Sequence, residues 1–334
     1  MKRALVLSGG GANGAFQVGA LEYIETHVKR RIEGFHFNII NGVSVGAING
    51  VMLAMDKFPD LVKIWDSPKL ERLIFTGRLE MLNVARKLLT REKSVLSNRP
   101  LFELLKRYVS LSLIDTDKFD FRLGAVSLRD GKYLALSPDD FEKDLEFQKA
   151  ILASASIPIL WEPVKSIETK EQTYFDVVDG SIRDTSPLGH VISDHPDEII
   201  IINCYTPDVE NKEIDESGKD IFSIASRALI DIALDEIFVN DLREFLTIND
   251  LVAQVKSQSP EMDLYRMSSS SGKRIRLQQF QTILIEPEKE MGNIIDFSPD
   301  KIKDRRKHGF EMAKKAFSQY DGSLKGHLFS NRSV

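Results

Sequence analysis

The stretch KRALVLSGGGANG at residues 2–14 and the stretch NIINGVSVGAING at residues 38–50 share one pattern. In each, a short apolar run ends at glycines and small polar residues, and apolar residues at helical spacing follow. The short run is typical of a buried strand, and the spacing after it is typical of a helix. The predicted elements are strands at 2–7 and 38–43 and helices at 15–29 and 45–55.

Two strand–helix units in succession predict an α/β fold, in which helices flank a parallel sheet. Further apolar runs add elements to this sheet. The additional predicted strands are 119–128, 132–137, 173–178, 198–204 and 281–285. The additional predicted helices are 147–156, 222–255 and 300–317, together with a charge-rich helical segment at 61–113. Ser, Gly and Pro at 257–272 predict a loop, and a loose tail is expected from about residue 322.

Composition and charge exclude several classes of protein. With 334 residues, 42% of them hydrophobic, the chain is long and apolar enough to bury a large core. The formal net charge of −5 leaves no overall basic field, so we expect no nucleic-acid partner. The single cysteine, Cys204, excludes an internal disulfide framework and predicts a small buried side chain. Apolar runs are too short for a secretory signal or a membrane span, so we expect a cytoplasmic protein, peripheral at the membrane if it meets one.

The glycine-rich segment 9–14 lies between the first predicted strand and the first predicted helix. Glycines let backbone N–H groups approach a ligand closely at the positive end of a helix, which suits a phosphate or a developing oxyanion. Gly9, Gly11 and Gly14 also satisfy the dinucleotide pattern G-x-G-x-x-G. That pattern expects an acidic residue at the end of the second strand, where this chain has none. A dinucleotide site and a purely structural turn therefore stay open as alternatives.

The segment Gly42-Val43-Ser44-Val45-Gly46 joins the second predicted strand to the second predicted helix. It matches G-x-S-x-G, the nucleophile elbow, in which a sharp turn projects the serine outward. The amides at the start of the helix would favour negative charge at Ser44. The simpler interpretation is that Ser44 only caps the helix. The strand–turn–helix context favours the nucleophile.

A serine nucleophile needs a general base, and no histidine stands in an obvious catalytic context. The six histidines, each interpreted as a surface or structural residue, are His27, His36, His190, His195, His308 and His327. Asp179-Gly180 instead follows the predicted strand 173–178, at the strand end where α/β folds place ligand sites. An aspartate there is able to take the serine proton directly if its surroundings tune its pKa. The simpler interpretation is an Asp-Gly turn.

Together these motifs resemble those of one family, the patatin-like phospholipases. Residues 9–14 resemble the oxyanion motif of the family, Gly42–Gly46 its elbow, and Asp179-Gly180-Ser181 its Asp-Gly-Gly or Asp-Gly-Ala sequence with one change. Further segments that resemble family landmarks are Ala153–Pro158, Asn98–Leu101, Asp296–Ser298 and Lys307–Ala313. The resemblance covers residues 3–205 and 280–318.

The resemblance implies a three-layer α/β/α patatin-like fold with a central, mostly parallel sheet flanked by helices. The motifs spread over the first 180 residues yet must meet in one site, and the strand at 281–285 also belongs to the family pattern. We therefore expect one domain. Its predicted parts are residues 1–320 as the patatin-like domain, with a helical lid-like insertion at 55–115 and a helical and loop insertion at 207–275, and a tail at 321–334.

The resemblance also implies a lipid acyl hydrolase, a phospholipase A or lysophospholipase-like esterase, that needs no metal or cofactor. Ser44 would be the nucleophile and Asp179 the general base. The residues implied for the oxyanion hole are Gly9, Gly10 and Gly11. The supporting motif residues are Asn13, Gly14, Gly42, Gly46 and Gly180. The family usually has Arg or Lys where this chain has Asn13, so a charge that supports the oxyanion loop or a substrate phosphate is missing.

The implied substrate is a fatty-acyl ester or a phospholipid. Basic and apolar side chains alternate in the segment 61–113, which predicts either contact with an anionic membrane surface or a solvated helix face. The basic residues interpreted as a solvated face of the last helix are Lys301, Lys303, Arg305, Arg306 and Lys307. Two further alternatives stay open: an acyltransferase that uses the same Ser44 acyl-enzyme, and an inactive lipid-binding protein, indicated by Asn13 alone.

Overall fold

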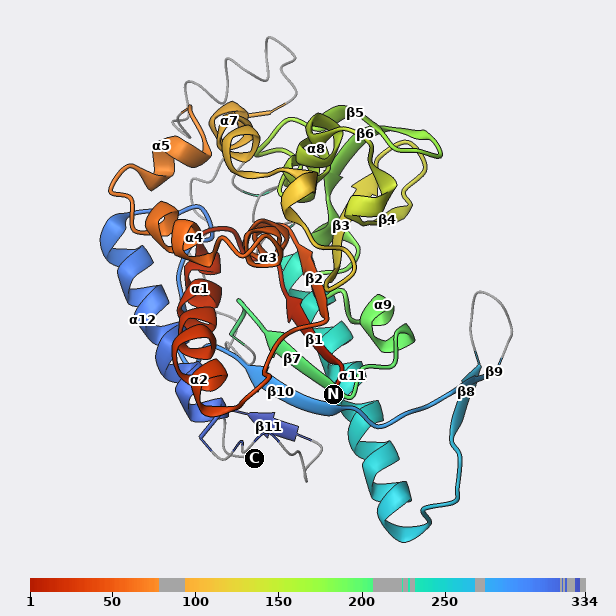
Figure 1. The fold of residues 1–334 in the computed structure, drawn as a ribbon. Helices are drawn as coiled ribbons and strands as arrows, with labels where there is room; N and C mark the ends of the chain where they lie inside the picture. The colour runs from red at the N-terminus through yellow and green to blue at the C-terminus, as the bar shows by residue number, and fades with distance from the viewer. Residues whose placement is uncertain are drawn as a thin grey trace.

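The fold is described from a computed structural model that covers residues 1–77, 94–206, 224, 228, 232–267, 274–318, 320, 322 and 328–330. Its centre is a mixed sheet to which this part of the chain contributes nine strands (Figure 1). Eight of them are in the order β11-β10-β7-β1-β2-β3-β6-β5, and β4 pairs with β3. The strands are β1 (Arg3–Leu7), β2 (Ile39–Val43), β3 (Asp120–Ser127), β4 (Tyr133–Leu136), β5 (Val164–Glu168), β6 (Thr173–Asp179), β7 (Glu198–Ile202), β10 (Gln281–Ile285) and β11 (Leu328–Ser330).

The six strands from β11 to β3 run parallel, whereas β4, β5 and β6 pair antiparallel. In the middle of the sheet, Leu7 of β1 lies opposite Gly42 of β2 and Ile202 of β7. All residues of these three strands are buried, as expected for parallel strands that are covered on both faces. Because parallel strands end at the same edge, the segments that follow β1, β2 and β7 meet there.

Helices cover both faces of the sheet (Figure 1). The helices are α1 (Gly14–Tyr23), α2 (Lys29–Arg31), α3 (Val45–Ala54), α4 (Phe58–Trp65), α5 (Leu70–Ile74), α7 (Arg99–Tyr108), α8 (Asp144–Ser154), α9 (Leu188–Ser193), α11 (Leu234–Gln258) and α12 (Pro299–Ala316). Alternate residues of β1 point to opposite layers, since successive side chains of a strand do so. Leu5 and Leu7 belong to the larger core cluster, whereas Ala4 and Val6 pack with residues of α9 and α11. The predicted three-layer α/β/α fold is confirmed.

Helices α1 and α12 lie side by side and meet at two glycines (Figure 1). A Cβ atom on Gly19 would overlap the carbonyl oxygen of Arg306, and one on Gly309 would overlap that of Phe16. The two backbones are therefore in direct contact at this crossing. Arg306 adds ion pairs from α12 to Glu22 of α1 and Asp66 after α4.

Most predicted elements are present, with ends shifted by a few residues. The predicted helix 147–156 begins earlier, at Asp144, because Asp144 and Glu146 provide the acidic first turn that a helix N-terminus favours. The strand β5 and the helix α9 were not predicted. Both are short and lack a strong local pattern. Pairing with β6 stabilises β5, and packing on the sheet stabilises α9. The division into one domain with two insertions stays a prediction.

Two predictions of irregular structure are wrong in part. The predicted loop 257–272 contains β8 (Tyr265–Met267), which pairs with β9 (Arg274–Arg276) in a separate hairpin. The predicted tail contains β11, which adds to the free edge of β10. An open strand edge offers backbone hydrogen bonds to almost any sequence, so local composition does not reveal this pairing. Parts of the predicted segments 61–113, 207–275 and 321–334 lie outside the described residues.

Candidate active site

Ser44 stands at the turn between β2 and α3, with φ 57° and ψ −128°. This left-handed backbone is unfavourable for a residue with a side chain and is typical of the serine in a nucleophile elbow. Ser44 occupies the N-cap position of α3, but its side chain makes no capping hydrogen bond, so capping does not explain the serine. A Cβ atom on Gly46 would overlap the carbonyl oxygen of Leu7, so the elbow packs against β1 more closely than alanine allows.

Asp179 ends β6 and is fully buried. Its Oδ1 atom accepts a hydrogen bond from the N–H of Ser181 at 2.8 Å, whereas Oδ2 has no hydrogen-bond partner within the described residues. Burial raises the pKa of Asp179 to about 6, and the Ser181 amide and the neighbouring hydroxyls of Ser44 and Ser181 oppose this rise. The site therefore has an available carboxyl oxygen near the Ser44 hydroxyl, on a group that titrates close to neutral pH.

The segment after α8 links these two residues. Ser154 Oγ accepts a hydrogen bond from the N–H of Ser44 at 3.0 Å, and the Ser156 carbonyl accepts one from the N–H of Asp179 at 3.1 Å. The Asn98 side chain donates to Ser156 Oγ at 2.8 Å, which ties the start of α7 to the same segment. The sequence marked Ala153–Pro158 only as a family landmark. Its role became visible with the fold, because these contacts join residues far apart along the chain.

The glycine-rich loop after β1 lies against Ser44. A Cβ atom on Gly9 would lie 3.4 Å from the Ser44 Cβ atom, and Gly11 lines the same cavity as Ser44. The N–H of Gly9 donates to the Thr185 carbonyl at 3.2 Å, so this amide already has an acceptor. In the described part of the chain, the N–H groups of Gly10 and Gly11 have no acceptor. The amides of Gly10 and Gly11, two of the three predicted donors, are therefore free to bind an oxyanion.

Asn13 and Cys204 pack beneath this loop. The Asn13 amide donates to the Cys204 carbonyl at 3.4 Å, and the Cys204 thiol donates to the Asn13 carbonyl at 3.5 Å. Burial raises the pKa of the Cys204 thiol to about 12, so the thiol is neutral. The prediction that Cys204 is a small buried side chain is confirmed. Asn13 braces the loop and brings no charge to it.

No described histidine contacts Ser44 or Asp179. His27 and His190 stack on tyrosines, and His36, His195 and His308 form hydrogen bonds outside the site. His327 lies outside the described residues. In the described part of the chain, Asp179 is the carboxyl that lies beside Ser44, and burial raises its pKa.

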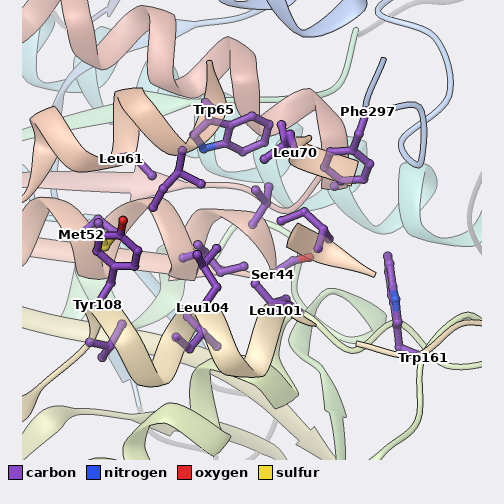
Figure 2. Close-up of a pocket in the computed structure, with 18 of the residues that line it drawn as sticks. Ser44, Met52, Leu61, Trp65, Leu70, Leu101, Leu104, Tyr108, Trp161 and Phe297 are labelled. Atoms are coloured by element: carbon purple, nitrogen blue, oxygen red, sulfur yellow. The ribbon is translucent and has the colours of Figure 1, made fainter. Parts of the chain in front are cut away.

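Ser44 is one of the residues that line an apolar cavity (Figure 2). Its volume is about 60 Å³. Helices α3, α4, α5 and α7 supply most of its aliphatic wall, and the aromatic wall residues are Trp65, Tyr108, Trp161 and Phe297. Within the described residues no charged side chain lines it. The predicted lid-like insertion thus contributes α4, α5 and α7 to the wall of the cavity.

A chain of buried polar side chains connects this wall to the end of β1. The Trp65 ring N–H donates to Asn49 at 3.0 Å, the Asn49 amide donates to Gln17 at 2.9 Å, and the Gln17 amide donates to the Ser8 carbonyl at 2.8 Å. Such a satisfied network fixes the orientation of its members. Sequence reasoning missed it, although Asn49 in an otherwise apolar helix was an available signal.

The described residues contain no group of three or more His, Cys, Asp or Glu side chains that could hold a metal ion. Among the described helices, none combines the length and apolar character that crossing a bilayer requires.

Comparison with known proteins gives a family match and two similar solved structures. The model of the patatin-like phospholipase family matches residues 5–192. The chain is similar to the crystal structure of VipD from Legionella pneumophila, with 12% identity and a TM-score of 0.39, and to that of the type III effector protein ExoU, with 14% identity and a TM-score of 0.38. These matches cover 93% and 96% of this chain but only 66% of VipD and 53% of ExoU. No curated protein matches the sequence.

Proposed function

The chain belongs to the patatin-like phospholipase family, and from this premise we propose that it is a lipid acyl hydrolase with Ser44 as nucleophile and Asp179 as general base. One observation carries the proposal. The strained Ser44 lies beside a fully buried carboxyl whose second oxygen has no hydrogen-bond partner in the described part of the chain. A serine of this geometry next to a base with a pKa of about 6 is suited to acyl transfer near neutral pH.

In the proposed first step, Asp179 takes the proton of Ser44 Oγ while Oγ bonds to the ester carbonyl carbon. The carbonyl electron pair moves to its oxygen, and the N–H groups of Gly10 and Gly11 stabilise the resulting negative charge. The bond to the leaving alcohol then breaks, and Asp179 returns the proton to that alcohol. Asp179 then takes a proton from water as the water oxygen bonds to the acyl carbon. The bond from that carbon to Ser44 Oγ breaks, Asp179 returns the proton to Oγ, and the fatty acid leaves.

The cavity supports a fatty-acyl chain as the group that binds beside Ser44. Each methylene that the cavity removes from water contributes about 0.8 kcal/mol to binding. Contact with a lipid surface is part of the proposal. Helix α7 supports it, since α7 buries Leu101 and Leu105 and exposes Arg99, Lys106 and Arg107 beside the cavity.

Labelling with a fluorophosphonate tests the nucleophile. We expect wild-type protein to be labelled at Ser44, identified by peptide mass, and to release fatty acid from a radiolabelled phospholipid in mixed vesicles. Ser44→Ala should be neither labelled nor active, whereas Ser193→Ala, an exposed serine on α9, should match wild type in both assays. Hydrolysis by Ser44→Ala at the wild-type rate would refute the proposal. Transfer of the labelled acyl group to an added lysolipid, in place of fatty-acid release, would identify an acyltransferase.

The pH profile tests the base. Because Asp179 acts in its ionised form, kcat/KM is expected to fall tenfold per pH unit below about pH 6 and to be level above it. Ser181→Ala removes a hydroxyl that lowers the pKa of Asp179, so the acid limb should move to higher pH. Ser193→Ala should leave the limb in place. An acid limb that Ser181→Ala leaves unmoved would argue against Asp179 as the titrating group.

A further inference from the structure

Arg305 of α12 is a buried cation, with 2% of its surface exposed. Its guanidinium donates to the carbonyl of Met291 at 2.7 and 2.9 Å, to that of Asn293 at 3.0 Å and to that of Asp296 at 2.6 Å. The sequence predicted a solvated face for the basic residues 301–307. That is correct for Lys301, Lys303 and Lys307 but wrong for Arg305.

Burial of this guanidinium is unfavourable by itself. Desolvation lowers the pKa of Arg305, and the charge of Asp296 opposes this. Within the described residues, its hydrogen bonds all go to backbone carbonyls rather than to a carboxylate. A buried cation persists when hydrogen bonds of this kind compensate for lost water, so the loop 291–296 and Arg305 stabilise each other.

The loop that Arg305 holds contacts the glycine-rich loop directly. The Ile294 carbonyl accepts a hydrogen bond from the N–H of Ala12 at 2.6 Å. A Cβ atom on Gly11, where φ is +54°, would overlap the same carbonyl oxygen. The Ile294 carbonyl therefore fixes the position of Gly11 and accepts the hydrogen bond of the Ala12 amide. The amides of Gly10 and Gly11 are then free to bind an oxyanion. The loop then continues into Phe297, which lines the apolar cavity.

The charge of Arg305 also acts on the residues beneath the glycine-rich loop. It lowers the pKa of the Cys204 thiol against the larger effect of burial. Cys204 packs under Gly10, since a Cβ atom on Gly10 would lie 2.5 Å from the Cys204 Cβ atom.

We propose that Arg305 is a positioning residue for the oxyanion hole. It holds the loop 291–296 so that the Ile294 carbonyl sets the Gly11 amide. The inference rests on the proposed function, because an oxyanion forms only if Ser44 attacks an ester. It connects a residue of α12, near the C-terminal end of the sequence, with the glycine-rich loop 9–14 near the N-terminal end.

The test compares Arg305→Gln with Arg306→Gln in the full-length protein. Both remove a guanidinium from α12, but Arg306 pairs with Glu22 and Asp66 and does not contact the loop. With a water-soluble short-chain ester, which does not depend on Phe297, we expect Arg305→Gln to lower kcat by about 10²–10³-fold, as does loss of an oxyanion donor, with little change in KM. The rate of fluorophosphonate labelling should fall in parallel. Arg306→Gln should keep the wild-type kcat even where its unfolding temperature falls.

Arg305→Lys distinguishes the effect of the positive charge from that of the hydrogen-bond geometry. It also provides the test if Arg305→Gln does not fold. Lysine keeps the charge but not the planar fork, so its kcat should fall by about tenfold and exceed that of Arg305→Gln. The inference is overturned if folded Arg305→Gln or Arg305→Lys turns over at the wild-type rate, or if Arg306→Gln loses as much kcat as Arg305→Gln. An inactive wild type, or an active Ser44→Ala, would instead refute the proposed function.

Discussion

Asp179→Asn is expected to lower ester turnover by about 10⁴-fold, the upper range for loss of a general base, while the protein stays folded. The amide is nearly the same size as the carboxyl and still accepts the hydrogen bond that Ser181 donates to Oδ1. It cannot accept the Ser44 proton. Steady-state hydrolysis of a short-chain ester measures the loss. A variant with more than a tenth of the wild-type turnover would contradict the proposed role of Asp179.

The same variant is expected to be more stable than wild type above pH 6. Asp179 is fully buried, and its pKa rises from 3.8 to about 6 on folding. A carboxyl with a raised pKa stabilises the folded state most below pH 3.8, and this contribution is lost as the pH rises to about 6. The difference between the two pKa values corresponds to about 3 kcal/mol of unfolding free energy. The asparagine variant does not lose this stability as the pH rises, because its amide does not ionise.

Urea unfolding between pH 4 and pH 8 measures this effect. The stability of Asp179→Asn relative to wild type should increase by about 2 kcal/mol between pH 4 and pH 7 and then stay level. Ser44→Ala keeps the carboxyl and should follow the wild-type pH dependence. Parallel curves for wild type and Asp179→Asn would show that burial of Asp179 does not oppose its ionisation.

Gly309→Ala is expected to destabilise the fold by about 3 kcal/mol, the upper part of the range for overpacking. The added methyl group would overlap the backbone of α1 at Phe16, which no rotamer change relieves. The helices α1 and α12 would have to separate, and the separation would disturb the Gly-rich loop before α1 and Arg305 on α12 together. Urea unfolding and ester turnover measure the two consequences.

Gly189→Ala is the matched control for this substitution. Gly189 lies in the helix α9, and a Cβ atom there would have no neighbour within 4 Å. Alanine is favoured over glycine in a helix by up to about 1 kcal/mol, so Gly189→Ala should be neutral or slightly stabilising. If both alanine variants have the same stability, the close contact between α1 and α12 does not contribute to the fold.

Local sequence patterns predicted the first two strands of the sheet and the helices that follow them. The β1–α1–β2–α3 order follows from short apolar runs and helical spacing, which nearby residues define without help from the rest of the chain. The strand β5, the helix α9 and the edge strand β11 escaped prediction. Each depends on a partner supplied by the fold, and the residues 164–168 give no strong periodic signal by themselves.

The candidate site divides in the same way. Ser44 and Asp179 stood out because a strand–turn–helix motif and an Asp-Gly strand end are local signals. The engagement of the Gly9 amide by Thr185 was not predictable, since it joins two loops more than 170 residues apart. The contact of Ser154 with Ser44, and that of Ile294 with Ala12, depend equally on how the loops meet at the sheet edge.

Residue types and short spacings were enough to establish the α/β fold class, the family, the two candidate catalytic residues and the absence of a histidine base from any catalytic motif. The folded chain was needed to show which glycine amides are free to bind an oxyanion, that α4, α5 and α7 line an apolar cavity, and that Arg305 lies buried behind the glycine-rich loop. These properties depend on burial and on hydrogen bonds between distant segments. Both arise when the chain folds and leave no periodic trace in the sequence.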